Sequence, residues 1–306
     1  MPHIRNAGLR RWGHYLKPDA SIEWTPSGLP RSPIMRMTPG MQANALFFSH
    51  PKWGGKYFDC ENHPGLIADR WLRATGSWDD KVVVDMGCGP GNLGWAMHAR
   101  PKALIGVDIS EKALKHAATL GYMPLYADVH DTPLASGCAD LVVANAVLHH
   151  IDDVAQVLRE CARLVKPGGM LVTDEDPLRS DHAIQGAGKL ISKLRGLVPL
   201  SRVKLHPTRK WKYTSFREQR ERLKTEVHFQ YPGDGIERGM FAEVLEPLGF
   251  SVRLYPHGHV AGPEIMSSDR GSNTALLRLA QRASGVDPDA SDLQLSVMCV
   301  AVRNLE

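Results

Sequence analysis

Short apolar stretches alternate with longer stretches of helical spacing through the centre of the chain. The apolar stretches predict strands at 81–85, 103–108, 124–127, 140–145 and 170–174. The segments that separate them repeat apolar residues every three or four positions, as an amphipathic helix does. Because the strands are almost continuously apolar, we expect a parallel sheet covered by helices on both faces.

The same pattern continues on either side of this central part. Residues 64–75 and 240–250 predict helices, while 251–257 and 293–303 predict two further strands. Strands and helices that alternate in this way are typical of the α/β class. The sequence therefore predicts an α/β fold with a sheet of seven strands.

Three segments do not follow the pattern. Residues 1–63 hold no long periodic segment but are rich in aromatic residues, 177–238 are polar and basic, and 257–292 are rich in Gly, Ser and Asp. We therefore expect an N-terminal lid at 1–63 and one domain at 64–306, with a helical basic insertion at about 177–238. The lid and the insertion should build the substrate pocket, because the sheet itself lacks one.

Composition narrows the class of protein without fixing a function. The 306 residues are 43% hydrophobic and 23% charged, as in a globular protein. No run is long and apolar enough to span a membrane, and the N-terminus lacks a signal-peptide pattern, so we expect a cytoplasmic protein without a membrane partner. The five cysteines are scattered and never form a CxxC pair, which argues against a disulfide framework and a zinc site.

A glycine-rich segment follows the first central strand. It runs Asp85-Met86-Gly87-Cys88-Gly89-Pro90-Gly91 and leads directly into a predicted helix. Glycines let the backbone approach a ligand and adopt positive φ, and the start of a helix offers free N–H groups. The spacing differs from the G-x-G-x-x-G of dinucleotide-binding folds, and an acid before the first glycine would repel a pyrophosphate but suit an amine.

At this point the sequence resembles the class I S-adenosylmethionine-dependent methyltransferases, whose first motif is D-x-G-x-G-x-G. Asp85, Gly87, Gly89 and Gly91 match that motif. The resemblance covers roughly 64–176 and 240–304. It implies a Rossmann-like, doubly wound sheet of seven strands whose last strand is antiparallel, and S-adenosylmethionine as the cofactor.

The resemblance also assigns cofactor contacts along the ends of the later strands. It implies that Asp108 holds the ribose hydroxyls and that Ile109 lies beside the adenine. Asp128 and Val129 would bind the adenine edge, and the backbone of Asn145 and Ala146 would follow the methionine moiety. Within the glycine loop, Cys88 has an expected backbone role and is not expected to be a reactive thiol.

The residues that carry catalysis are less clearly marked. His149 and His150 follow the fourth strand on the cofactor side, where either could remove a proton or orient the acceptor. Tyr57 could touch the substrate, and with Trp53 and Phe58 it could close over the cofactor.

Two further groups lie at the same end of the predicted sheet. The acids Asp174, Glu175 and Asp176 follow the fifth strand and could include a partner for a substrate amine. His257 and His259 are interpreted as an exposed loop pair, because no third metal ligand has a suitable spacing.

We therefore expect an enzyme that transfers a methyl group to a small molecule. The most specific interpretation is methylation of the methionine thioether to S-methylmethionine, which needs no general base, and the alternative is O- or N-methylation of a natural product or quinone-like acceptor. The oligomeric state is open, with a homodimer as one option.

The basic insertion also allows a function other than methylation of a small molecule. Residues 201–224 hold nine Lys or Arg against two Glu and include Trp211, Tyr213 and Phe216, a pattern that could bind RNA. An RNA methyltransferase is therefore an alternative to the small-molecule enzyme. Because the net charge of +4 is concentrated there, nucleic-acid binding is not expected of the core. A protein that binds S-adenosylmethionine without catalysis is the remaining alternative. The insertion could instead lend one cation to an anionic substrate group.

Overall fold

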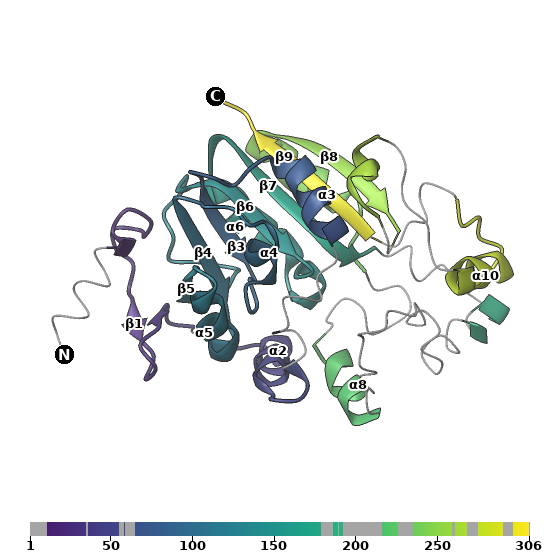
Figure 1. Ribbon diagram of the computed structural model, residues 1–306, viewed down its shortest axis with the longest axis horizontal. Coiled ribbons are helices and arrows are strands. Elements are labelled where there is room, and N and C mark those ends of the chain that lie inside the picture. The colour runs from purple at the N-terminus through teal and green to yellow at the C-terminus, as the bar shows by residue number, and fades with distance from the viewer. Residues whose placement is uncertain are drawn as a thin grey trace.

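A single mixed sheet forms the centre of the computed structural model (Figure 1). The structure describes residues 11–34, 36–54, 58, 65–178, 186–188, 190–191, 216–225, 235–258, 261–267, 275–289 and 296–305. The strands are β1 (Glu23–Trp24), β2 (Pro30–Arg31), β3 (Val82–Met86), β4 (Ala103–Asp108), β5 (Met123–Tyr126), β6 (Ala139–Asn145), β7 (Val165–Pro177), β8 (Phe250–His257) and β9 (Ser296–Arg303). Their order across the sheet is β1-β2-β5-β4-β3-β6-β7-β9-β8.

The direction of the strands agrees with the expected fold. Strands β5, β4, β3, β6 and β7 are parallel, and the last strand, β9, runs antiparallel between β7 and β8. The sheet has nine strands, so the predicted number of seven was wrong. The two additional strands, β1 and β2, have two residues each, which is too short to give a pattern of alternation along the sequence.

Helices cover both faces of the sheet, as in a doubly wound fold. The described residues include the helices α2 (Pro39–Ser49), α3 (Gly65–Thr75), α4 (Asn92–Ala96), α5 (Glu111–Thr119), α6 (Val154–Leu164), α8 (Phe216–Leu223), α9 (Met240–Leu245) and α10 (Ala275–Ala283), with short 3-10 turns η3 (Leu148–His150), η6 (Glu246–Leu248) and η7 (Pro263–Ser267). Helices α3 and α5 share one apolar core with Val83 and Val143, whereas α6 and α9 share the other with Val84. Alternate residues of the strands thus face opposite layers.

Capping residues place the predicted helices where the sequence indicates. The Ser110 hydroxyl accepts the N–H of Ala113 at the start of α5, and the Asp153 carboxylate accepts the N–H of Gln156 at the start of α6. Gly121, at φ +93°, follows the end of α5, as expected of a residue that ends a helix. These capped helices fix the loops that join them to the carboxyl ends of the strands.

The N-terminal segment contains more regular structure than its sequence pattern predicts. Helix α2 occupies 39–49, where no periodic segment was expected, and Figure 1 places it beside α8 at the foot of the sheet. It begins at Thr38, whose hydroxyl accepts the N–H of Met41, and Pro39 occupies its first turn. The apolar positions of α2 include exposed Leu46 as well as buried Phe47, which explains why no clear periodicity marks it.

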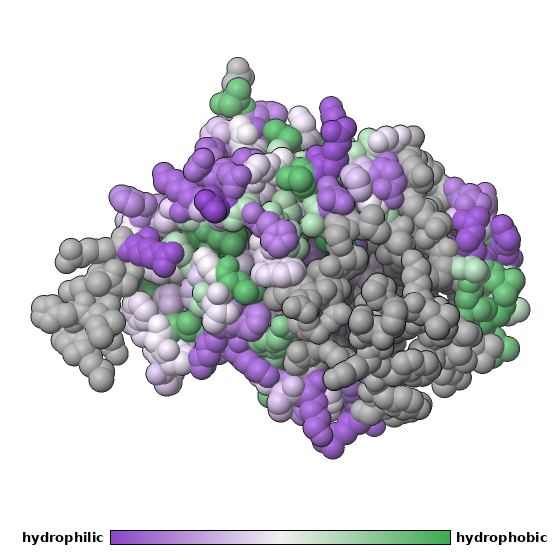
Figure 2. Space-filling view, in the orientation of Figure 1, coloured by the Kyte–Doolittle hydropathy of each residue, from purple (hydrophilic) through white to green (hydrophobic). Residues whose placement is uncertain are grey.

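Most of the basic insertion lies outside the described residues. Its described helix, α8, has exposed Arg217, Arg220 and Lys224, and Figure 2 shows hydrophilic side chains where α8 lies. Trp211 and Tyr213 are not among the described residues, so their proposed interleaving with basic side chains stays a prediction. Among the described residues, no helix combines the length and the apolar character needed to cross a membrane.

Candidate functional site

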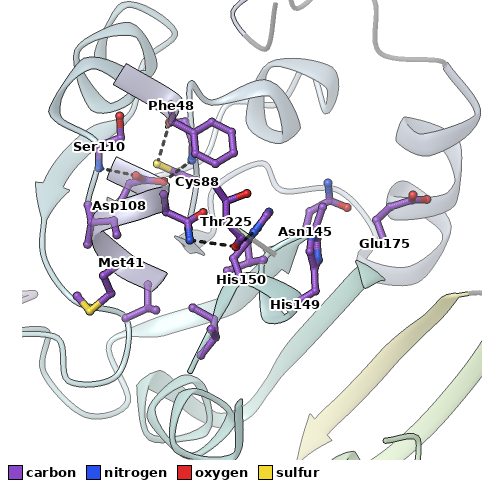
Figure 3. Close-up of a pocket in the computed structure, with 18 of the residues that line it drawn as sticks. Met41, Phe48, Cys88, Asp108, Ser110, Asn145, His149, His150, Glu175 and Thr225 are labelled. Carbon is purple, nitrogen blue, oxygen red and sulfur yellow. Dashed lines mark hydrogen bonds between the residues drawn. The ribbon is translucent and has the colours of Figure 1, made fainter. Parts of the chain in front are cut away.

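A cavity of about 520 Å³ lies at the carboxyl ends of the central strands (Figure 3). One wall comes from the ends of β3, β4 and β5, and the other comes from the ends of β6 and β7 together with α2 and α8. We call the first wall the cofactor half, defined by Asp85, Gly87, Gly89, Asp108 and Asp128. We call the second wall the acceptor half, defined by Phe48, His149, His150 and Glu175.

Nearly all of the site residues predicted from sequence meet in this cavity. The residues that line it are Asp85, Gly87, Cys88, Gly89, Asp108, Ile109, Asp128, Val129, Asn145, Ala146, His149 and His150. Gly91 is not part of the lining, because it precedes α4 at φ +90° and packs against Tyr122. Tyr57 lies outside the described residues, so its proposed contact with the substrate stays a prediction.

The glycine loop has two distinct structural roles within a few residues. Gly87, at φ +69°, faces Val147 so closely that an added Cβ would lie 2.7 Å from two of its methyl carbons. Gly89, at φ +51°, has no atom within 4 Å of that position and therefore leaves open space in front of the loop. Gly87 thus serves the packing of the loop, while Gly89 serves the approach of a ligand.

Asp85 is buried at the base of the loop. Its Oδ2 accepts a hydrogen bond of 2.7 Å from the Tyr122 hydroxyl, which in turn accepts the N–H of Gly94 at 2.9 Å. Burial raises the pKa of Asp85 to about 7, against the opposing effect of the Tyr122 hydrogen bond. A nearby cationic group would stabilise the ionised carboxylate, which suits the amine partner expected at this position.

Asp108 ties the glycine loop to the following helix. Its Oδ2 accepts the N–H of Gly89 at 2.8 Å, and its Oδ1 accepts the N–H of Ser110 at 2.7 Å. Burial raises the pKa of Asp108, although these backbone hydrogen bonds oppose the shift. An ionised carboxylate has further lone pairs, so Asp108 can hold the loop and still accept hydrogen bonds from ligand hydroxyls.

Asp128 is oriented by a residue that the sequence analysis did not single out. His130 donates to Asp128 Oδ1 through its backbone N–H at 2.9 Å and contacts it through Nδ1 at 2.6 Å. Burial raises the pKa of Asp128, but the hydrogen bonds from His130 outweigh it and lower the pKa overall. Cys88 lies in the same half, and burial raises its thiol pKa well above the usual range, which agrees with a backbone role.

His149 and Asp176 form a hydrogen-bonded pair in the acceptor half. Asp176 Oδ1 lies 2.7 Å from His149 Nδ1 and accepts the backbone N–H of His149 at 3.1 Å. Burial raises the pKa of Asp176 to about 7, partly opposed by the hydrogen bond from the His149 backbone. Its other oxygen, Oδ2, is buried and has no hydrogen-bond partner among the described residues, which adds to the cost of ionising it.

His150 has a different environment from its neighbour. Its Nδ1 lies 2.6 Å from the carbonyl oxygen of Thr225, so this nitrogen carries a proton and donates it. Burial, together with the neighbouring His149, lowers the pKa of His150 to about 3. His150 is therefore neutral near pH 7, and only His149 of the two has a carboxylate partner.

Helix α2 forms the roof of the acceptor half, a role that the sequence analysis did not assign to it. Met41, Asn44, Phe47 and Phe48 all line the cavity. Asn44 Nδ2 also donates to the Thr225 carbonyl at 3.2 Å, next to the bond from His150. The Thr-Pro pair at 38–39 is the only capping signal in the sequence that could have located this helix.

The aromatic residues expected to close over the cofactor lie elsewhere. Trp53 stacks on His50 with ring centroids 3.9 Å apart, and Phe58 packs edge-on against His116 at 5.1 Å. Neither residue lines the cavity, because α2 occupies the position that was assigned to them.

A buried charge cluster lies behind the acceptor half. Arg70 donates to Asp174 at 2.8 Å, to the Ala261 carbonyl at 2.7 Å and to Glu175. His257, expected to be exposed, is fully buried and bonds Asp174 at 2.8 Å, so that expectation was wrong for His257, while His259 lies outside the described residues. The ligand atoms of Asp174, Glu175 and His257 lie within 4.8 Å of one another. Arg70 takes up both carboxylates, so the cluster resembles an ion-pair network more than a metal site.

Comparison with known proteins assigns the central part of this architecture to a family. Residues 84–173, which run from β3 to β7, match the family model described as a methyltransferase domain. The chain contains a methyltransferase domain. The match spans the glycine loop, Asp108, Asp128 and the His149 segment, and it supports S-adenosylmethionine as the cofactor of this domain.

Several curated relatives of the methyltransferase domain carry the same name. The chain is 38% identical over 106 residues to the ubiquinone biosynthesis O-methyltransferase of Ralstonia nicotianae, covering 32% of this chain and 44% of that protein. It is 35% identical over 129 residues to that of Nitrosomonas europaea, covering 39% and 55%. The chain thus spans about half the length of the curated relatives it matches.

Solved structures give a more distant similarity. A S-adenosylmethionine-dependent methyltransferase from Thermotoga maritima, described as a possible histamine N-methyltransferase, is 14% identical with a TM-score of 0.49, over 87% of this chain and 100% of that one. Geranyl diphosphate C-methyltransferase from Streptomyces coelicolor is 16% identical with a TM-score of 0.45, over 78% and 75%.

The cavity of the methyltransferase domain fits its cofactor. Gly89 leaves open space where a ligand would meet the loop, and Asp108 presents a carboxylate toward the cavity. Asn145 Oδ1 is buried and lacks a hydrogen-bond partner among the described residues, as expected of an acceptor kept for a ligand donor. Asp85, Gly89, Asp108, Asp128 and Asn145 are the residues that would hold S-adenosylmethionine.

Proposed function

We propose that this protein transfers a methyl group from S-adenosylmethionine to a hydroxyl oxygen of a small molecule. The pair formed by His149 and Asp176 at the cavity wall is the observation that carries this proposal. The names of the two curated relatives described above support the same reaction, since both are O-methyltransferases. The coarser proposal, methylation of a small molecule, rests on the methyltransferase-domain match and on the cavity at the ends of the strands.

The bound cofactor supplies an electrophilic methyl group on a sulfonium centre. Asp108 and the glycine loop hold the cofactor half in place, while the residues of the acceptor half orient the second substrate. Phe48 and Met41 give the roof an apolar surface that excludes water from the acceptor.

His149 is the proposed general base. An ionised Asp176 orients the His149 imidazole through Nδ1 and raises its basicity toward the hydroxyl proton of the acceptor. Asp176 then stabilises the imidazolium that results. The pKa of Asp176 is about 7, so Asp176 becomes ionised as the pH rises through neutral. The pair can then accept a proton.

The same pair argues against methionine as the acceptor. A thioether sulfur carries no proton, so a base beside it would have no role in the reaction. A hydroxyl acceptor has to lose a proton, and a base makes that possible near neutral pH. We therefore favour O-methylation, which entered as the alternative, over the more specific S-methylmethionine interpretation.

One assay separates these possibilities. The purified protein is incubated with labelled S-adenosylmethionine and, in separate reactions, 4-propylcatechol, methionine or bulk RNA, and products are identified by mass spectrometry. We expect label on the catechol oxygen. Label on methionine or on RNA would replace this proposal with the corresponding alternative, and binding of S-adenosylhomocysteine without turnover on a broad metabolite extract would favour a protein without catalysis.

A further inference from the structure

Glu175 has an unusual position at the carboxyl end of β7. Its side chain lines the cavity, and Figure 3 shows it on the far side of Asn145 and His149 from Asp108. Resting on the proposed function, we infer that Glu175 determines acceptor specificity by accepting a hydrogen bond from a donor group of the acceptor, with a cationic group preferred over an anionic one.

The backbone around Glu175 is held in a conformation that non-glycine residues rarely adopt. Glu175 has φ +63°, in the left-handed region, which costs about 1 kcal/mol for a residue with a Cβ. The pairing of β7 with β9 shifts register between Thr173 and Asp176, so the strand bulges outward at this point. Such strain persists when surrounding contacts fix it, and it commonly marks a functional position.

A second strained residue supports the first. Ala146, at the end of the adjacent strand β6, has φ +55°, and its N–H donates to the carbonyl of Asp174 at 2.8 Å. The left-handed residue that follows β6 is therefore hydrogen-bonded to Asp174, the residue directly before the left-handed Glu175 in β7. This arrangement fixes the direction in which the Glu175 side chain leaves the sheet.

The charge cluster behind Glu175 holds one of its carboxylate oxygens. Oε1 pairs with Arg70, which is only 1% exposed and is itself fixed by Asp174 and the Ala261 carbonyl. Oε2 has no partner among the described residues, and the Glu175 side chain is 28% exposed, toward the cavity that it lines. Arg70 thus orients the carboxylate while leaving one oxygen available to a ligand.

The position of Glu175 in the sheet separates it from the cofactor half. The strand order is β5-β4-β3-β6-β7, and Asp128, Asp108 and Asp85 lie at or close to the carboxyl ends of the first three of these strands. Strand β6 lies between them and Glu175. Burial raises the pKa of Glu175, and Asp174 raises it further, although Arg70 opposes both effects. A cationic or donor group of the acceptor would stabilise the charge that this environment disfavours.

Three catechols of similar size test the inference. They are 4-(2-aminoethyl)catechol, 4-propylcatechol and 3,4-dihydroxyphenylacetate, which carry a cationic, an apolar and an anionic group on the same ring. We expect kcat/KM to fall in that order for the wild type. In Glu175→Gln, which keeps an oxygen for Arg70, we expect the ratio between the cationic and anionic probes to fall at least tenfold, mainly through KM.

Two controls make the result specific to Glu175. Asp69→Asn removes an exposed acid next to Arg70 on α3 and should leave the ratio unchanged, while Glu175→Asp should retain part of the wild-type preference. Affinity for S-adenosylhomocysteine should change less than twofold in Glu175→Gln, because a larger change would place Glu175 against the cofactor and overturn the inference. Thermal unfolding confirms that the variants are folded.

The test also separates this inference from the proposed function. Calorimetric binding of the three probes to protein loaded with S-adenosylhomocysteine measures the preference without requiring turnover. A Glu175-dependent charge preference without methylation would support the inference and overturn O-methylation of catechols. Methylation with the same probe ratio in wild type and Glu175→Gln would overturn the inference and leave the proposed function intact. A wild-type preference for the anionic probe would also overturn the inference, because it would indicate recognition by Arg222 on α8.

Discussion

The two halves of the cavity are built in different ways. The cofactor half consists of a glycine loop and acids that grip backbone N–H groups, all within one stretch of parallel strands and their connections. The acceptor half brings together side chains from α2, η3, the end of β7 and α8, which are far apart in the sequence. Short-range backbone geometry therefore defines the first half, whereas tertiary packing defines the second.

Removal of the His149 side chain is expected to have the largest effect, and that effect should fall on turnover and not on cofactor affinity. We expect His149→Ala to lower kcat by about 10²- to 10⁴-fold, the usual contribution of a general base, while the affinity for S-adenosylhomocysteine stays within about twofold. Steady-state kinetics and calorimetry measure the two quantities. Exposed His14→Ala is the matched control, and near-normal turnover in His149→Ala would exclude the proposed base.

The reverse separation is expected for Asp108. Asp108→Ala removes a carboxylate that binds two loop N–H groups, and charged hydrogen bonds contribute about 1.5–3 kcal/mol. We expect the dissociation constant of S-adenosylhomocysteine to rise by about 10- to 100-fold, with thermal unfolding still cooperative. An unchanged affinity in calorimetry would remove Asp108 from the cofactor half, and exposed Asp19→Ala serves as the control.

Two glycine substitutions in the cofactor half should have different effects, one mainly on the free energy of unfolding and the other mainly on cofactor affinity. Gly87→Ala pushes a Cβ against Val147 and should lower the free energy of unfolding by about 1–3 kcal/mol through overpacking. Gly89→Ala meets no atom, so its effect should fall mainly on cofactor affinity. Gly121→Ala, also at positive φ with open space, controls for backbone strain. Equal losses of stability in all three would contradict this assignment.

The smallest expected effect concerns the pH dependence of the acceptor half. In the unfolded chain His150 gains a proton below its ordinary pKa of 6.5, but in the folded chain it stays neutral until about pH 3. The unfolded state binds more protons in this window, so stability falls as the pH decreases through it. We expect wild type to lose about 1–2 kcal/mol more than His150→Gln between pH 6.5 and pH 5, measured by urea unfolding. Parallel pH curves for both proteins would contradict a buried, neutral His150.

The contrast between the halves also explains how far the sequence could be interpreted. Apolar runs and the D-x-G-x-G-x-G pattern identify the parallel strands and the acids Asp108 and Asp128, because each feature depends on neighbouring residues. Strands β1 and β2 gave no such signal because they have only two residues each. Helix α2 gave none because its apolar residues are not confined to one buried face.

The hydrogen-bond partners of the acceptor-half residues could not be predicted from their spacing in the sequence. His149 and His150 are adjacent in sequence, yet only the fold gives one of them Asp176 and the other the Thr225 carbonyl. His257 follows a strand like a loop residue, but its burial beside Asp174 depends on Arg70 from α3. Local pattern can place such residues at the correct end of the sheet and cannot assign their partners.

The carbonyl of Thr225 connects three elements that line the cavity. This single oxygen accepts hydrogen bonds from Asn44 on α2 and from His150, while it follows directly on α8. Separating the two helices at this point would break the bond from Asn44, and moving the end of α8 away would break both bonds. One backbone oxygen therefore couples α2, η3 and the end of α8, and a substitution that displaces this oxygen would disturb the cavity wall at all three elements.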